Sequence, residues 1–208
     1  YNDSGSNVNI IINVTGNVSV EAGGNLSVTS TSATASFLAA GNLTIIAANI
    51  NLHGNATGNG ANCAGGATTC GTGGSINISS TGVVNITGGI TAVGGGVSTD
   101  YQVGGLGGNI TVNAASFYAS SSALIESSGG LVDISTGAYV NGGSASTISV
   151  NATIISSNAT VRSVGGNGGL SYCDSAYGRN GNGGTVNFNG SSVSVLGSAV
   201  NVSRGLSG

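Results

Sequence analysis

The chain has 208 residues, of which 40 are Gly and only 4% are charged, and it contains no Pro, Met or Trp. Its formal net charge is −3, with three Arg as its only basic side chains besides one His, so the sequence offers no basic patch for nucleic acid. No apolar run approaches the roughly 18 residues that a membrane-spanning helix needs. Aliphatic residues in alternating runs still provide surface to bury, so we expect a folded β protein.

One short motif recurs along the chain: a Gly pair followed by alternating aliphatic and small polar residues. It begins at Gly23, Gly73, Gly107 and Gly183, with looser copies at Gly41 and Gly129. Alternation places every second side chain on one face, which is the period of a strand. Recurrence of the motif down the whole chain indicates stacked repeats. The Gly pairs are expected at tight corners with positive φ.

We predict an all-β fold, a right-handed parallel β-helix of about eight coils, each of about twenty residues with three short strands. The prediction treats 1–208 as one domain, with residues 1–6 as an N-terminal extension. The predicted coils are 7–22, 23–40, 41–54, 73–93, 107–128, 129–145, 146–164 and 183–203. In the clearest coil, 73–93, the residues predicted to fill the interior are Ile76, Ile78, Val84, Ile86 and Ile90, and those predicted to face solvent are Asn77, Asn85 and Thr91.

Three Gly-rich segments interrupt this rhythm, at 55–72, 94–106 and 165–182. Each precedes a Gly-Gly strand start, so we expect all three to leave the solenoid at the same corner and to form one loop-bearing edge. All three Cys lie in these segments, which makes this edge the candidate for specific contacts with a ligand.

The pattern Gly-Gly-x-Ile-x-Ile followed by Val-x-Ile-x-Gly-x-Ile resembles the haemagglutinin-type β-helix repeats of large secreted adhesins and surface filaments. The resemblance covers most of the chain, from about residue 7 to residue 203. It implies an extracellular, repetitive architecture and specifies function less closely than fold. Calcium-binding versions of such repeats carry an Asp in each Gly-rich turn, which this chain lacks, so we expect no metal.

Asn-x-Ser/Thr, the acceptor signal for N-linked sugar, occurs thirteen times. The acceptor residues are Asn2, Asn13, Asn17, Asn25, Asn42, Asn55, Asn77, Asn85, Asn109, Asn151, Asn158, Asn189 and Asn201. We expect several of them to be glycosylated, because so few charges are present to solvate the surface. Asn25 and Asn42 are expected to be crowded neighbours on adjacent coils. The alternative is that Asn side chains stack into hydrogen-bonded ladders without sugar.

Cys63 and Cys70 lie seven residues apart in one Gly-rich segment, so we expect them to form a disulfide outside the cell. Cys173 is then left unpaired or bonded to another chain. His53 is isolated in sequence and is expected at a strand end, in solvent, so a zinc site is not expected.

The chain is not expected to be an enzyme. β-Helix enzymes that act on polysaccharides need clustered carboxylates, whereas the six here are scattered. Asp133 and Glu126 form the nearest approach to a pair, and we interpret them as two solvated carboxylates. No cofactor is expected.

We therefore expect a structural subunit of a secreted, N-glycosylated fibre at the cell surface, whose partners are further copies of the chain and covalent glycans. The two ends lack an evident cap, and Ile10, Ile11 and Ile12 form an edge prone to association. Copies would assemble head to tail or by donation of the first strand. The alternative is a ligand-binding adhesin segment of a longer protein.

Overall fold

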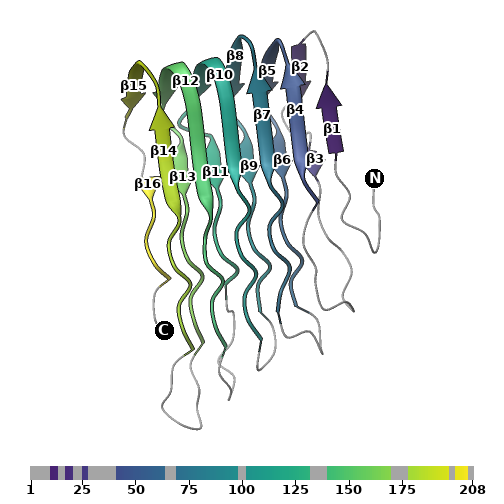
Figure 1. Cartoon of the computed structure of the whole chain (residues 1–208), viewed down its shortest axis with the longest axis vertical. Helices are drawn as coiled ribbons and strands as arrows, with labels where there is room; N and C mark the ends of the chain where they lie inside the picture. Colours follow the sequence, from purple (N-terminus) through teal and green to yellow (C-terminus); the bar gives the residue numbers. More distant parts are fainter. Residues whose placement is uncertain are drawn as a thin grey trace.

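The computed structural model describes residues 41–63, 69–97, 102–131, 140–169, 178–196 and 200–205 with their side chains, and the backbone of 10–13, 17–20 and 25–27. These residues form sixteen β-strands and no helix. All strand pairs are parallel, so the described chain is a β-solenoid, as the alternating motif predicted. Figure 1 shows the coils side by side, from β1 at one side of the stack to β14–β16 at the other.

The strands form three rows along the stack. The first row holds β1 (Ile10–Asn13), β4 (Leu43–Ala47), β7 (Ile76–Ser80), the first part of β10 (Ile110–Ala119), the first part of β12 (Thr147–Ser157) and β14 (Thr185–Asn189). The second row holds β2 (Asn17–Val20), β5 (Asn49–Leu52), β8 (Val83–Ile86), the later parts of β10 and β12, and β15 (Ser192–Val195). The third row holds β3 (Asn25–Ser27), β6 (Asn55–Thr57), β9 (Gly89–Thr91), β11 (Leu124–Glu126), β13 (Thr160–Arg162) and β16 (Val200–Asn201).

The strand register corrects the predicted length of a coil. Ile10 pairs with Leu43, an offset of 43 − 10 = 33 residues, and Ile110 pairs with Ile148, an offset of 148 − 110 = 38 residues. A coil is therefore almost twice as long as the twenty residues expected, and the described chain passes through the first row six times. The error has two sources: the prediction starts coils at the Gly pairs of Gly23 and Gly129, and it counts the Gly-rich segments 55–72, 94–106 and 165–182 as insertions outside the coils.

Aliphatic side chains fill the interior between the three rows. The predicted inward residues Ile76, Ile78, Val84, Ile86 and Ile90 are all fully buried, which confirms the inward face of this coil. Their register partners are buried too, including Leu43, Ile50, Ile110, Phe117 and Ile125. Each fully buried side chain of this size contributes about 1.5–3 kcal/mol of hydrophobic free energy.

The Gly-rich segments do not leave the solenoid; they form its second half. An outgoing layer follows the third-row strands and comprises 58–63, 92–97, 127–131, 163–169 and 202–205. A return layer precedes the first-row strands and comprises 69–75, 102–109, 140–146 and 178–184. Figure 1 shows these segments as extended stacked traces below the strands. The expected loop insertions at 55–72, 94–106 and 165–182 are therefore wrong for their described residues, and 55–57 is strand β6. We call this part the glycine half.

Backbone hydrogen bonds join the two layers of the glycine half in a continuous series. Gly95 donates its N–H to the carbonyl oxygen of Gly71 at 2.8 Å, and Gly105 donates to Gly95 at 2.9 Å. The series crosses between the layers at every step and continues through Gly130, Gly143, Gly166 and Gly181 to Gly205. Other bonds stack each layer on itself, such as the one from Gly107 N–H to the Ser144 oxygen at 2.9 Å. Main-chain bonds thus satisfy most of these backbone groups, and side chains bond others, such as the Asn180 Oδ1 that accepts the Gly168 N–H at 2.7 Å.

Close approach of the two layers explains the glycines. A Cβ added to Gly94 of the outgoing layer would lie 2.0 Å from the Gly105 oxygen of the return layer, and one added to Gly129 would lie 1.8 Å from the Gly143 oxygen. Among the described Gly pairs of the motif, Gly107–Gly108, Gly129–Gly130 and Gly183–Gly184 do not have positive φ. The expectation that they form tight corners is wrong: they are glycine because the opposite backbone occupies the space of a side chain.

Candidate functional site: the open end and the outer surface

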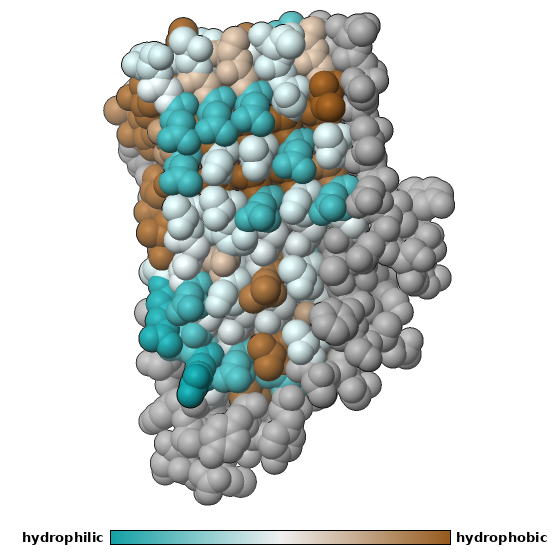
Figure 2. Space-filling view, in the orientation of Figure 1, coloured by the Kyte–Doolittle hydropathy of each residue, from teal (hydrophilic) through white to brown (hydrophobic). Residues whose placement is uncertain are grey.

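The last described coil exposes the side chains that fill the interior elsewhere. Val193 is the register partner of the buried Ile155, yet its exposed fraction is 46% against 1%. Val200, the partner of the buried Val161, is 44% exposed. Leu196 and Val202 are exposed beside them. Hydrophobic residues line the corresponding edge in Figure 2, on the side where β14–β16 lie in Figure 1. We call this surface, made by 186, 188, 193, 196, 200 and 202, the open end.

The backbone at the open end is also an edge. Among the described strands, β14 and β15 pair with β12 alone, and β16 pairs with β13 alone. The outer side of each of these strands therefore presents its N–H and C=O groups at the end of the described stack. Exposed edges of this kind pair readily with another strand.

Strands β1, β2 and β3 form the opposite edge of the described stack. The register of Ile10 and Ile12 matches that of the buried Leu43 and Ile45, whereas Ile11 matches the half-buried Thr44. Two of the three predicted assembly residues thus hold inward register positions at this edge.

Most of the described sequons lie on the outer surface. The exposed acceptors are Asn42, Asn55, Asn77, Asn109, Asn158, Asn189 and Asn201, and the half-buried ones are Asn85 and Asn151. For Asn13, Asn17 and Asn25 the backbone alone is described, and Asn2 lies outside the described residues. Hydrophilic residues form rows across the stacked strands on the face shown in Figure 2.

Several acceptor side chains already bond from coil to coil. The Asn42 Oδ1 accepts the Ser75 N–H at 2.9 Å, and the Asn55 Oδ1 accepts the Gly89 N–H at 2.8 Å. The register partner of Asn25 is Asn55, so the expectation that Asn25 and Asn42 are neighbours on adjacent coils is wrong. The shorter predicted coil caused this error.

One column of asparagines forms a ladder. Asn151 donates its Nδ2 to the Asn113 Oδ1 at 2.9 Å, and Asn189 donates its Nδ2 to the Asn151 Oδ1 at 2.8 Å. The alternative interpretation of the Asn-rich surface, stacked amides, therefore holds at these three residues. The nitrogen that would carry a sugar is a hydrogen-bond donor at both Asn151 and Asn189.

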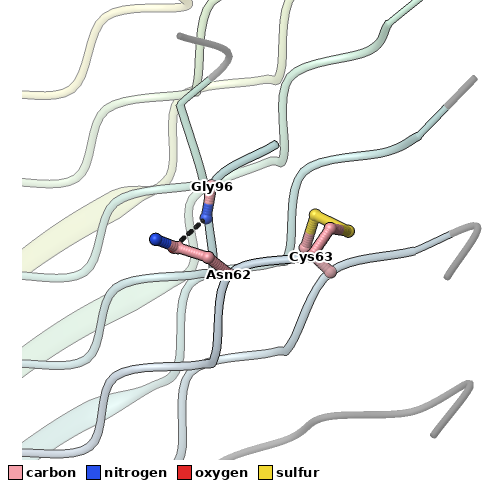
Figure 3. The surroundings of a disulfide bond; sticks show 4 residues. Asn62, Cys63 and Gly96 are labelled. Atoms are coloured by element: carbon pink, nitrogen blue, oxygen red, sulfur yellow. Dashed lines mark hydrogen bonds between the residues drawn. A yellow bond between two sulfur atoms is a disulfide. The ribbon is translucent and has the colours of Figure 1, made fainter. Parts of the chain in front are cut away.

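The disulfide cross-links the outgoing and return layers of the glycine half. Cys63 of the outgoing layer and Cys70 of the return layer are bonded, with a Cα–Cα distance of 4.6 Å (Figure 3). Both are buried in a small cluster with Val97 and Val140. Beside it, Gly96 donates its N–H to the Asn62 Oδ1 at 2.8 Å (Figure 3). Cys173 lies outside the described residues.

Charged groups form no evident catalytic cluster in the described part of the chain. The Glu126 Oε1 lies 3.6 Å from the Nη1 of Arg162 on the adjacent coil. Asp133, which was expected to lie near Glu126, is outside the described residues. His53 follows β5 and is half-buried, with its Nδ1 2.9 Å from the Thr87 Oγ1. Within the described ranges, no three His, Cys, Asp or Glu side chains gather as metal ligands, and no helix is suited to cross a membrane.

Comparison with known proteins gave no family model, no curated protein and no solved structure that matches this chain.

Proposed function

We propose that this chain is a structural subunit of an extracellular, N-glycosylated fibre built on a right-handed solenoid, in which copies join head to tail or by donation of the first strand. The open end supports this proposal most directly. Val193, Val200 and Leu196 expose aliphatic surface at a sheet edge that pairs with no further strand among the described residues. A contact between two different ends of identical subunits generates an open filament when successive copies continue along one axis, as stacked coils do.

Surface chemistry supports an extracellular setting and covalent attachment of glycans. With 4% charged residues, the chain has few groups that keep molecules apart in solution. Seven of the described sequon acceptors are exposed, and the disulfide suits an oxidising compartment. An intact mass equal to that of the bare polypeptide would remove the glycan part of the proposal.

Charge placed at the open end tests the fibre. We expect the double variant Val193→Asp, Val200→Asp to stay monomeric in sedimentation velocity at concentrations where the wild type assembles, because each carboxylate would be buried in the joint. Ser121→Asp, in an exposed turn in the middle of the stack, is the matched control and should assemble like the wild type. Wild-type protein that stays monodisperse at high concentration would contradict the proposal.

The second candidate function is an adhesin segment that binds a ligand along the glycine half. Val103 and Leu106, three residues apart in the return layer, are exposed, and Leu131 of the outgoing layer is exposed as well. Because Val103 and Leu106 belong to the proposed ligand surface and lie away from the open end, the discriminating variant is Val103→Ser, Leu106→Ser. An adhesin loses ligand binding in this variant, whereas a fibre still assembles.

A further inference from the structure

We propose that copies join by continuing the coil: β1, β2 and β3 of one copy stack on β14, β15 and β16 of the preceding copy, in the register that links coils within the chain. This inference rests on the proposed fibre and specifies its joint. Inside the chain, one column runs from Ile10 through Leu43, Ile76, Ile110 and Ile148 to Val186. Continued by one more coil, that column places Ile10 of the second copy on Val186.

The two edges match in every row. In the second row, the column that begins at Val18 ends at the exposed Val193. In the third row, the column that begins at Leu26 ends at the exposed Val200. In each of the three rows, Val186, Val193 and Val200 therefore meet an aliphatic residue in the corresponding position of the first coil. A slip of one residue would place outward positions against the interior, so the register is well specified.

A polar column supports the same register. The Asn113–Asn151–Asn189 ladder ends at the open end, and the first-coil residue in its column is Asn13. The proposed joint thus places Asn13 of the second copy directly beyond Asn189, where a further amide continues the ladder. A slipped joint would place Ile12 or Val14 there.

Arg204 indicates that the layer stacked on the open end is a second copy and not a further coil with a glycine return layer. By its hydrogen-bond register, Arg204 holds the position that Gly60, Gly94, Gly129 and Gly165 hold in earlier coils. A Cβ at Gly129 would lie 1.8 Å from the Gly143 oxygen, and one at Gly165 would lie 2.0 Å from the Gly181 oxygen. A further glycine return layer would therefore collide with the Arg204 side chain. The segment 1–9, which precedes the first strand, contains no Gly pair and so predicts no such layer.

Paired cysteines test the joint. In a Cys173→Ser background, Asn13→Cys with Asn189→Cys places two thiols on adjacent strands of the proposed joint, within the 4.4–6.8 Å Cα separation that a disulfide allows. Ser27→Cys with Asn201→Cys does the same in the third row, since both belong to one column. Asn17→Cys with Asn189→Cys is the control, because the column of Asn17 ends at Ser192, three residues away from Asn189.

After mild oxidation of assembled protein, non-reducing electrophoresis should show a ladder of covalent oligomers for both matched pairs and monomer for the control. A ladder for the first pair alone would assign the joint to donation of the first strand and overturn full stacking. Filaments that show no covalent oligomers for the matched pairs, or as many for the control pair, would overturn the proposed register but not the proposed fibre. Protein that stays monomeric and forms no intermolecular disulfide would overturn both the proposed joint and the proposed fibre. This result is expected if a further coil of a longer chain covers the open end.

Discussion

Gly130 donates its backbone N–H to the carbonyl oxygen of Gly105 at 2.9 Å, although the two residues belong to opposite layers of the glycine half. The bond is one step in a series that runs along the stack from Ala61 to Gly205. Such a contact between two backbones leaves no room for any side chain. The glycine half is therefore held together by main-chain hydrogen bonds, and the strand half by aliphatic packing.

Gly129→Ala tests whether this close approach is required. Its Cβ would lie 1.8 Å from the Gly143 oxygen of the return layer, so we expect the free energy of unfolding to fall by about 2–3 kcal/mol or more in urea titration. Gly58→Ala is the matched control, because its Cβ would lie 3.3 Å from the Gly74 oxygen and a small shift can accommodate it. Equal losses in the two variants would contradict the two-layer packing.

Asn151→Ala tests the asparagine ladder. The substitution removes one hydrogen bond to Asn113 and one to Asn189, and we expect a loss of about 1–2 kcal/mol in the free energy of unfolding. Thr153→Ala, an exposed position two residues along the same strand, should change stability by less than about 0.5 kcal/mol. A loss no larger than that of Thr153→Ala would show that the ladder contributes nothing to stability.

The disulfide should stabilise the tips of the layers more than the rest of the glycine half. In Cys63→Ser, Cys70→Ser, we expect faster hydrogen exchange at the Gly71 amide, which bonds the Ala61 oxygen at 2.9 Å beside the disulfide. The Gly181 amide, bonded to the Gly166 oxygen three coils away, is the internal control and should keep its protection. Uniform loss of protection at both amides would instead indicate that the disulfide supports the whole fold.

Glycan occupancy should follow the hydrogen bonding of the acceptors. Asn77 is exposed on the outer face of β7, whereas Asn151 is half-buried and uses its Nδ2 in the ladder. In secreted protein, peptide mapping after enzymatic deglycosylation should therefore find Asn77 occupied and Asn151 bare. A glycan on Asn151 together with a bare Asn77 would contradict the prediction that the ladder hydrogen bonds prevent glycosylation.

The strand half could be predicted from the sequence because its period is local. Alternation identifies Ile76, Ile78 and Ile90 as inward residues without knowledge of the coil length. The coil length could not be obtained that way, since the partner of Asn25 depends on a register thirty residues distant.

The glycine half also leaves a signal, which period-two reasoning overlooks. In the return layer, Val103, Leu106 and Asn109 are exposed and separated by Gly pairs, so the outward positions recur every third residue. The open end could be expected only in general terms, because exposure of Val193 is a property of the stack as a whole.

The axial repeat of the assembled material tests the head-to-tail fibre most directly. Six passes at about 4.8 Å per coil give about 29 Å per subunit if each copy continues the coils of the last. Electron microscopy of the wild-type protein should therefore show filaments with a subunit repeat of about 29 Å and strands perpendicular to the axis. Monodisperse particles, or filaments with an unrelated repeat, would contradict the account.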